Sequence, residues 1–298
     1  MSFDVWKPLY DDKFETKKYL YHYTTVDTAI KILLTNSLLF SRINETNDSM
    51  ESKAKIDFEQ MYDEDDIKSV EDFIKMKKEI SKYFEQCREI VQLLCFSVDT
   101  RITEKDRKQF MKSVYNKDKY YDISGRGFAF PRMWAQYANN NSGVCLIFDK
   151  VKLLNQIKKR IEFVKDDLVI YKSFVDKYIV HKSQMEDLYE RISMVTNGSL
   201  TMFNMIQNDK AFLKINFFEK LNDWENEHEY RIIVLMGNKD MNTTRIPVMG
   251  VNDFLEGIVI GEKMDDSYAK TLKMIIDANK MECDIKRIHF GSNICKLE

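Results

Sequence analysis

The sequence is poor in glycine and proline, and it lacks the common motifs for binding phosphate or zinc. Its 298 residues include 9 glycines and 3 prolines, with no Pro-, Gly- or Ser-rich linker. We therefore expect a single domain over residues 1–298, with helical insertions near residues 50–90 and 150–218. No Walker loop, GxGxxG, GxSxG or HExxH pattern occurs, so phosphate-cradling loops, serine hydrolases and zincins have no support.

The chain also lacks a long apolar run, a CxxC pair and an excess of charge. No apolar run reaches the length of a membrane span, so we expect a soluble cytoplasmic protein with no membrane partner. Five cysteines, mostly within apolar runs, fit buried thiols in a reducing compartment, and four scattered histidines form no zinc-binding pair. The 46 basic and 48 acidic residues nearly balance, which argues against a surface that binds the phosphates along a nucleic-acid duplex. These totals do not exclude local basic patches.

Short apolar segments near both ends of the chain predict strands, and charged segments between them predict helices. A helix is predicted after the cap Thr25, with Ala29, Ile30, Leu33 and Leu34 on one face. The spacing of apolar residues predicts two amphipathic helices over 50–89, mostly helix over 151–218 with one strand near 166–173, and helices at 131–141 and 265–280. Strands are predicted at 17–25, 38–41, 90–99, 144–148, 229–236, 243–250, 256–264 and 284–290. The fold class is therefore α+β.

The segment WENEHEYRIIV, residues 224–234, places acids at alternate positions before an apolar run. An extended chain would put Glu225, Glu227, Glu229 and Arg231 on one face, and Tyr230, Ile232 and Val234 on the other. The charged face indicates either a solvated edge strand or a row of carboxylates with a function. Arg231 can lower the pKa of a neighbouring carboxylate, bind a pyrophosphate, or simply pair with Glu229.

Three other polar segments lie beside predicted strands. In YHYTT, His22 and Thr24 share one strand face and could hold a ribose diol or an amide, whereas the alternative is a structural histidine beside a helix cap. The segment NETNDSME, residues 44–51, is typical of a turn. Trp134 and Tyr137 are three residues apart on a helix, a spacing more often found in a core than in a ligand platform.

These segments, in this order, resemble the bacterial DUF2971 family. Its pattern runs from a strand with HYT, through a loop with NDPxE, to SFS, MWAxYA with GvcLxF, and WxxExExR. The resemblance covers roughly residues 18–290, apart from the helical insertions. Ser49 departs from the pattern, because the family usually has proline after Asn-Asp.

The DUF2971 family is in turn similar to ADP-ribosyltransferase-like folds, and this resemblance implies an α+β fold with a split mixed sheet core. It also implies NAD as substrate. His22 would bind the adenosine ribose, Glu229 the nicotinamide ribose, and Glu227 would be the first acid of an ExE pair. The further NAD-binding candidates are Tyr23, Thr24, Asn47, Asp48, Trp134, Tyr137 and Arg231, with either Trp134 or Tyr137 stacking on nicotinamide.

Three functions are compatible with this sequence. The leading hypothesis is an NAD-dependent ADP-ribosyltransferase-like enzyme that modifies a protein or nucleic acid, as a toxin or an anti-phage defence effector, with no metal. The second is a non-catalytic nucleotide-sensing or interaction module. The third is a magnesium-dependent nuclease that uses Asp48, Glu51, Glu227 and Glu229 as ligands. The acceptor and the oligomeric state are not determined by the sequence.

Overall fold

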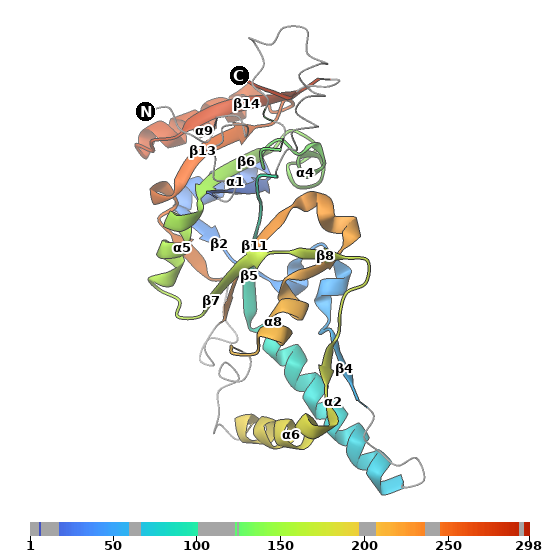
Figure 1. Ribbon diagram of the computed structural model, residues 1–298. Helices are drawn as coiled ribbons and strands as arrows, with labels where there is room; N and C mark the ends of the chain where they lie inside the picture. Colours follow the sequence, from blue (N-terminus) through green and yellow to red (C-terminus); the bar gives the residue numbers. More distant parts are fainter. Residues whose placement is uncertain are drawn as a thin grey trace.

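The computed structural model of the chain describes residues 6, 18–59, 67–100, 123, 125–196, 207–235, 245–291 and 295–298. It is a mixed α+β structure built on one large sheet (Figure 1). In spatial order the sheet contains β15 (Cys295–Leu297), β14 (Asp284–Phe290), β13 (Leu255–Ile260), β6 (Val144–Asp149), β1 (Tyr19–Thr24), β5 (Val91–Ser97), β11 (Glu229–Leu235) and β7 (Val164–Leu168), with β3 (Ser41–Arg42) also on β5. The pair β13 and β14 is parallel and its neighbours are antiparallel, so the sheet is mixed.

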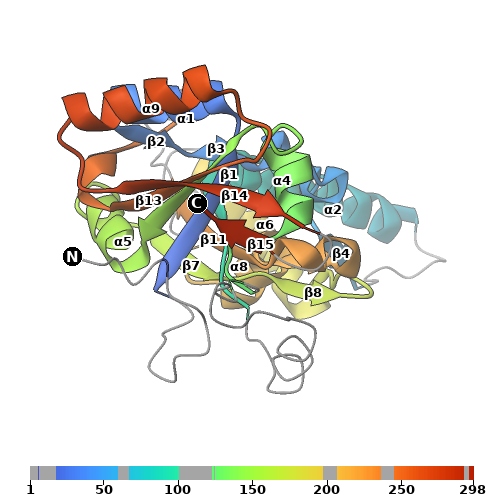
Figure 2. The same cartoon turned by 90° about the horizontal axis from the view of Figure 1, so that it is seen from above.

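One face of the sheet carries a continuous apolar core under three helices. These are α1 (Val26–Thr35), α5 (Lys150–Lys158) and α9 (Asp266–Ala278). Alternation along each strand points every second residue to this face, as Tyr230, Ile232 and Val234 show on β11. Figure 2 shows α1 and α9 together on one side of the sheet and α8 (Lys210–Phe217) on the other.

The opposite face carries two separate apolar cores. One lies over β1, β6 and β13 and includes Trp134 of α4 (Pro131–Tyr137). The other lies over β5 and β11, under α8 and α2 (Ile67–Glu89). The residues of β5 and β11 that fall between the two cores are polar or charged, for example Ser97 and Arg231. On this face of the sheet, a polar strip therefore separates the two apolar cores.

The sheet opens between β1 and β5. These two strands pair at the single position where Tyr21 faces Ser97. Further along the same edge of β5, Leu93 pairs with Ser41 of β3. Within the described part of the chain, residues 94–96 thus have no strand partner on the edge of β5 that faces β1. Side chains rather than a neighbouring strand border this edge.

A projection extends away from the sheet and contains α2, α6 (Lys182–Thr196), and the pair β4 (Ile56–Phe58) and β9 (Tyr178–Val180) (Figure 1). Its N-terminal part differs from the expectation of two helices over 50–89. The described residues there form a short 3-10 helix η3 (Ser49–Ser52), β4 and the single helix α2. Residues 56–58 form a strand rather than a helix because they pair in parallel with β9. This partner is distant in sequence, so the local pattern of residues does not indicate it.

The other sequence expectations are largely confirmed. Every predicted strand has a counterpart, including β2 (Ser37–Leu39) and β12 (Pro247–Met249), which pair with each other. The region 151–218 contains α5, α6 and α8 as expected, but more strand than predicted: β7, β8 (Ile170–Lys172) and β9. A further strand that was not predicted, β10 (Glu219–Leu221), follows this region and pairs with β8. No helix among the described residues has the length and apolar content needed to cross a membrane.

The helix α1 begins and ends as its sequence predicts, but its buried face is displaced by one position. The hydroxyl of Thr25 accepts a hydrogen bond of 3.3 Å from the Thr28 amide, and Asn36 takes the left-handed conformation that ends the helix. Leu33 is fully buried, whereas Leu34, expected on the same face, is 63% exposed. The face that meets the core therefore runs through Ile32 rather than Leu34.

Two neighbouring leucines test this orientation of α1. Leu33→Ala should lower the free energy of unfolding by about 2–5 kcal/mol, because it removes buried methyl groups from the core. Leu34→Ala should change it by less than about 0.5 kcal/mol, because that side chain lies in water. Urea unfolding followed by circular dichroism measures both values. Equal losses in the two variants would contradict the orientation.

Candidate functional site

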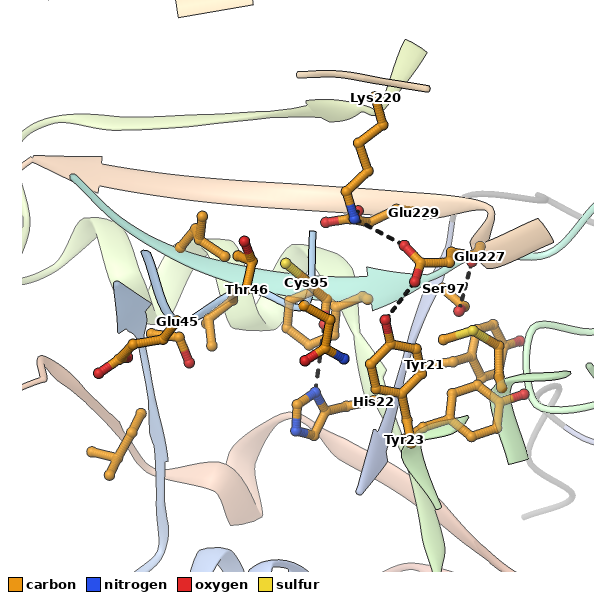
Figure 3. A pocket seen from close by; sticks show the side chains of 18 residues that line it. Tyr21, His22, Tyr23, Glu45, Thr46, Cys95, Ser97, Lys220, Glu227 and Glu229 are labelled. Atoms are coloured by element: carbon orange, nitrogen blue, oxygen red, sulfur yellow. Dashed lines mark hydrogen bonds and ion pairs between the residues drawn. The ribbon is translucent and has the colours of Figure 1, made fainter. Parts of the chain in front are cut away.

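A cavity of about 210 Å³ occupies the opening between β1 and β5. Residues from β1, from β5 and from the charged segment before β11 contribute to its walls (Figure 3). The lining residues are Tyr21, His22, Tyr23, Leu39, Ser41, Glu45, Thr46, Asn47, Leu93, Leu94, Cys95, Phe96, Ser97, Met133, Tyr137, Lys220, Glu227 and Glu229. The walls thus combine apolar and aromatic side chains with a small charged group.

The charged segment is not the continuous strand that its alternation predicts. Residues 222–227 form a 3-10 helix, η4 (Asn222–Glu227), and His228 has a left-handed backbone with φ of 45°. The strand β11 begins at Glu229. Glu225 is consequently exposed on η4, while the turn at His228 brings Glu227 back beside Glu229. The edge-strand alternative is also wrong, because β11 lies between β5 and β7 and is buried throughout.

Arg231 is a fully buried cation that binds two carboxylates. Its Nε and Nη2 donate to the two oxygens of Glu229 at 2.8 and 3.0 Å, and its Nη1 donates to Glu51 Oε1 at 2.7 Å. Nη1 also donates to the carbonyl oxygen of Phe217 at 2.7 Å. Such charge-assisted bonds in a buried environment fix the guanidinium and hence the direction of the Glu229 side chain. Arg231 itself lies behind Glu229 and does not line the cavity.

Lys220 of β10 is the second cation of the cluster. Its Nζ lies 2.9 Å from Glu227 Oε2, 2.8 Å from Glu229 Oε2 and 3.9 Å from Glu51 Oε2. Figure 3 shows the lysine side chain reaching toward the two cavity carboxylates. We call these five side chains, Glu51, Lys220, Glu227, Glu229 and Arg231, the buried charge cluster. Each of the five is 5% exposed or less.

The cluster keeps Glu229 ionised. Burial alone would raise the pKa of Glu229, but the charges of Arg231 and Lys220 outweigh it and lower the pKa below its usual value. Burial would likewise lower the pKa of Lys220, yet the carboxylates of Glu229 and Glu51 raise it. At neutral pH the cavity therefore presents a carboxylate and an ammonium group rather than a neutral acid and amine.

The two aromatic candidates of α4 separate in the structure. Trp134 is fully buried in the core, where its Nε1 donates to the carbonyl oxygen of Phe128 at 2.7 Å. Tyr137 lines the cavity, and its hydroxyl donates to Glu227 Oε1 at 2.5 Å. Tyr137 is thus the aromatic side chain of this pair that a ligand in the cavity can touch.

His22 lies in the same cavity as the two glutamates, on the other side of β5 from Lys220 (Figure 3). Its Nδ1 is 3.5 Å from the carbonyl oxygen of Cys95, an acceptor, so Nδ1 carries the hydrogen and Nε2 is the acceptor. Burial lowers the pKa of His22, against the smaller effect of that carbonyl, so the ring is neutral at pH 7.

The remaining candidates divide between the cavity and its surroundings. Tyr23 and Asn47 line the cavity, and the Tyr23 hydroxyl also donates to the carbonyl oxygen of Gly127 at 2.7 Å. Thr24 and Asp48 do not line it. Asp48 instead caps η3 by accepting a hydrogen bond of 2.8 Å from the Met50 amide, which is the turn role that the loop composition predicts.

Sequence reasoning missed Lys220 as a member of the site. It occurs in NFFEKL, residues 216–221, where a glutamate and a lysine interrupt an apolar run. Paired opposite charges within an apolar run indicate buried ion pairs, because each charge needs a partner once it leaves water. That signal was available, but no spacing rule links residue 220 to a carboxylate at 229 across a 3-10 turn.

The carboxylates that the nuclease hypothesis assigns to magnesium are paired with these cations. Glu51, Glu227 and Glu229 are engaged by Arg231 or Lys220. No group of three or more His, Cys, Asp or Glu side chains in the described ranges is arranged to hold a metal ion. A divalent cation would have to displace Lys220 or Arg231 to reach these oxygens.

The buried charge cluster predicts that replacing Arg231 destabilises the fold. Arg231→Met should lower the free energy of unfolding by about 3–5 kcal/mol, because three buried carboxylates would then share one cation. Arg245→Met is the matched control, since Arg245 is 49% exposed in its side chain and pairs with Glu45 at 3.2 Å. The control should lose less than about 1 kcal/mol. Urea unfolding checks both, and a loss at Arg231 no larger than that at Arg245 would contradict the assignment.

The neutral His22 predicts a pH dependence of stability. Because its pKa is lowered in the fold, its stabilising contribution is complete above the unfolded value of about 6.5 and is lost as the pH falls through the folded value. Between pH 7 and pH 5 the wild type should therefore lose more unfolding free energy than His22→Gln. Parallel losses in urea titrations of the two proteins would show that His22 is not held neutral.

Comparison with known proteins found similarity to one family model over part of this site. No match was found among curated proteins or among solved structures. The matched segment, residues 133–232, includes Tyr137, Lys220, both cavity glutamates and Arg231, while the segments around His22 and Asn47 lie before it. Residues 133–232 match the model of the family described as Protein of unknown function (DUF2971), and this match supports the DUF2971 resemblance over these residues.

Proposed function

We propose that the protein is an ADP-ribosyltransferase-like enzyme that uses NAD to modify a macromolecule. The observation that carries this proposal is that one cavity, in the opening between β1 and β5, is lined by His22 from the first strand and by Glu227 and Glu229 near the last third of the chain. An imidazole on an early strand and a late glutamate beside a split sheet are the two features that the resemblance to ADP-ribosyltransferase-like folds implies.

The chemistry of the site suits cleavage of an N-glycosidic bond to ribose. In this step the bond between C1′ and the nicotinamide nitrogen breaks, and its electron pair leaves with the nicotinamide. Positive charge develops on the sugar ring until the acceptor's nucleophilic atom bonds to C1′ and its proton passes to solvent. A carboxylate held ionised in a buried site stabilises that charge and can accept a hydrogen bond from a ribose hydroxyl. Glu229 meets the first condition because Arg231 and Lys220 lower its pKa.

The neutral His22 supports the binding part of the proposal. Its free Nε2 can accept a hydrogen bond from a ribose hydroxyl, and Asn47 and Tyr137 add further polar groups to the walls. A non-catalytic nucleotide-sensing module would use the same groups, so binding alone does not separate it from the enzyme. The toxin or defence role belongs to this proposal as its biological setting and rests on the resemblance.

Release of nicotinamide from NAD tests the proposal. The wild-type protein should release nicotinamide, and both Glu229→Gln and Glu227→Gln should reduce the rate by about a hundredfold or more, since each removes a carboxylate from the cavity. Glu225→Gln is the matched control, because Glu225 is exposed and outside the cavity. Its rate should equal that of the wild type.

Two other results would redirect the interpretation. Tight binding of NAD in calorimetry, with no nicotinamide release from the wild type, would support the sensing module instead. Nucleic-acid cleavage that requires magnesium and stops with a chelator would support the nuclease. Nicotinamide release at the wild-type rate by both glutamine variants would contradict a role of Glu227 and Glu229 in the reaction.

A further inference from the structure

We propose that Arg88, the penultimate residue of α2, couples the projection to the cavity: it is a positioning residue that holds Glu51 and, through Arg231, the side chain of Glu229. This inference goes beyond the proposed function, because it concerns how the cavity wall is held and applies equally to an enzyme and to a sensing module. Arg88 itself does not line the cavity. Its effect on Glu229 passes through two intermediate residues.

Arg88 is a buried cation whose hydrogen bonds go to uncharged oxygens. It is 1% exposed. Its Nη1 donates to the side-chain and main-chain oxygens of Asn216 at 3.2 and 3.4 Å, and its Nη2 donates to the main-chain carbonyl oxygen of Glu51. An apolar side chain of similar length would fill this space without the cost of removing a charge from water. The arginine therefore contributes directed hydrogen bonds to two separate elements, which an apolar side chain cannot make.

Glu51 is held at two points by different partners. Its main-chain oxygen is bound by Arg88, and its side-chain Oε1 is bound by Nη1 of Arg231 at 2.7 Å. Glu51 lies on η3, a four-residue 3-10 helix, and so short an element has few main-chain hydrogen bonds of its own. The position of the Glu51 carboxylate beside Arg231 consequently depends on contacts with other elements, and Arg88 provides the contact at the Glu51 main chain.

The segment that follows η3 is attached to the same two helices as Arg88. The amide of Ala54 donates to Glu85 Oε1 on α2 at 2.9 Å. The amide of Lys55 donates at 2.8 Å to Asn216 Oδ1 on α8, the atom that also accepts from Arg88. A shift of α2 relative to α8 would therefore displace η3 and the residues after it.

The helix α2 connects the projection with the sheet (Figure 1). Within the projection it packs against α6, and its last residues lie directly before β5, which forms a wall of the cavity. The two residues that bind the η3 segment, Glu85 and Arg88, lie near this end of α2. Movement of the projection against the sheet is thus transmitted to η3 by hydrogen bonds, and contiguous networks of this kind carry coupling between distant sites.

Arg231 passes the constraint from Glu51 to the cavity wall. Its Nε and Nη2 bind the two oxygens of Glu229 while its Nη1 binds Glu51, so the three side chains are fixed relative to one another. If Glu51 moves away, Nη1 loses its charged partner and keeps the carbonyl oxygen of Phe217. The guanidinium is then less firmly oriented, and the Glu229 side chain moves with it.

The thiol of Cys95 reports on Glu229 without any ligand or reaction. Cys95 lines the cavity, and burial together with the carboxylate of Glu229 raises its pKa. Displacement of Glu229 should therefore lower that pKa, raise the thiolate fraction and speed alkylation of Cys95. Cys145 is fully buried in a different part of the sheet, on β6, so its alkylation reports general unfolding instead.

Alkylation of the full chain with iodoacetamide, followed by mass spectrometry of its peptides, tests the inference. Arg88→Lys keeps the charge but cannot make the forked hydrogen bonds of a guanidinium. It should speed alkylation of Cys95 by about tenfold relative to Cys145, because the opening is local. Arg88→Met should have at least the same effect. If Arg88→Met does not fold, the comparison of Arg88→Lys with the wild type decides alone.

A double variant tests the route through Glu51. Glu51→Gln should itself speed alkylation of Cys95, because it removes the charged partner of Arg231 Nη1. Adding Arg88→Lys to Glu51→Gln should then change the rate by less than about twofold, since both act on one connected network. A further tenfold increase in the double variant would show that Arg88 acts by another route and would overturn the inference.

An exposed arginine of the projection is the matched control. Arg191 on α6 is 56% exposed in its side chain and pairs with Asp187 at 3.1 Å. Arg191→Met should leave both thiols at their wild-type rates. Equal acceleration of Cys95 and Cys145 in the Arg88 variants, or no acceleration of Cys95, would overturn the inference. The measurement uses no NAD, so it can succeed or fail independently of nicotinamide release.

Discussion

The two salt bridges of Arg231 hold together parts of the chain that are far apart in sequence. Through Glu51 and Glu229 the guanidinium connects η3 with the start of β11, and through the carbonyl of Phe217 it reaches the end of α8. Buried ion pairs of this kind add little net stability, because removing both charges from water costs several kcal/mol. Their effect is to fix direction: two carboxylates and one lysine have defined positions beside a cavity.

The sheet provides the space that this cluster borders. Strands that pair along their whole length leave no room for a ligand between them, whereas β1 and β5 pair at one position and then separate. Apolar cores on either side of the opening hold the two halves in place. The cavity therefore extends through the sheet from Lys220 and the glutamates to His22, and its polar groups come from both of its faces.

The DUF2971 match and the buried charge cluster bear on the same region of the chain. The matched segment contains four of the five cluster residues, and Glu51 is the one that lies before it. The family description assigns no activity, so the chemistry has to be argued from the site itself. The site itself offers two buried carboxylates, of which Glu229 is held ionised, together with a neutral imidazole and one bound lysine.

The sequence by itself determined most strands of the large sheet, the cap of α1 and the polar role of Asp48, because these depend on neighbours within a few residues. It also indicated His22 and the two glutamates as site residues. Only the tertiary structure decided that Glu227 reaches the cavity from a 3-10 turn, that Trp134 belongs to the core while Tyr137 lines the cavity, and that Lys220 joins the carboxylates. These depend on contacts between residues distant in sequence, such as Arg231 with Glu51, and alternation along one strand cannot report them.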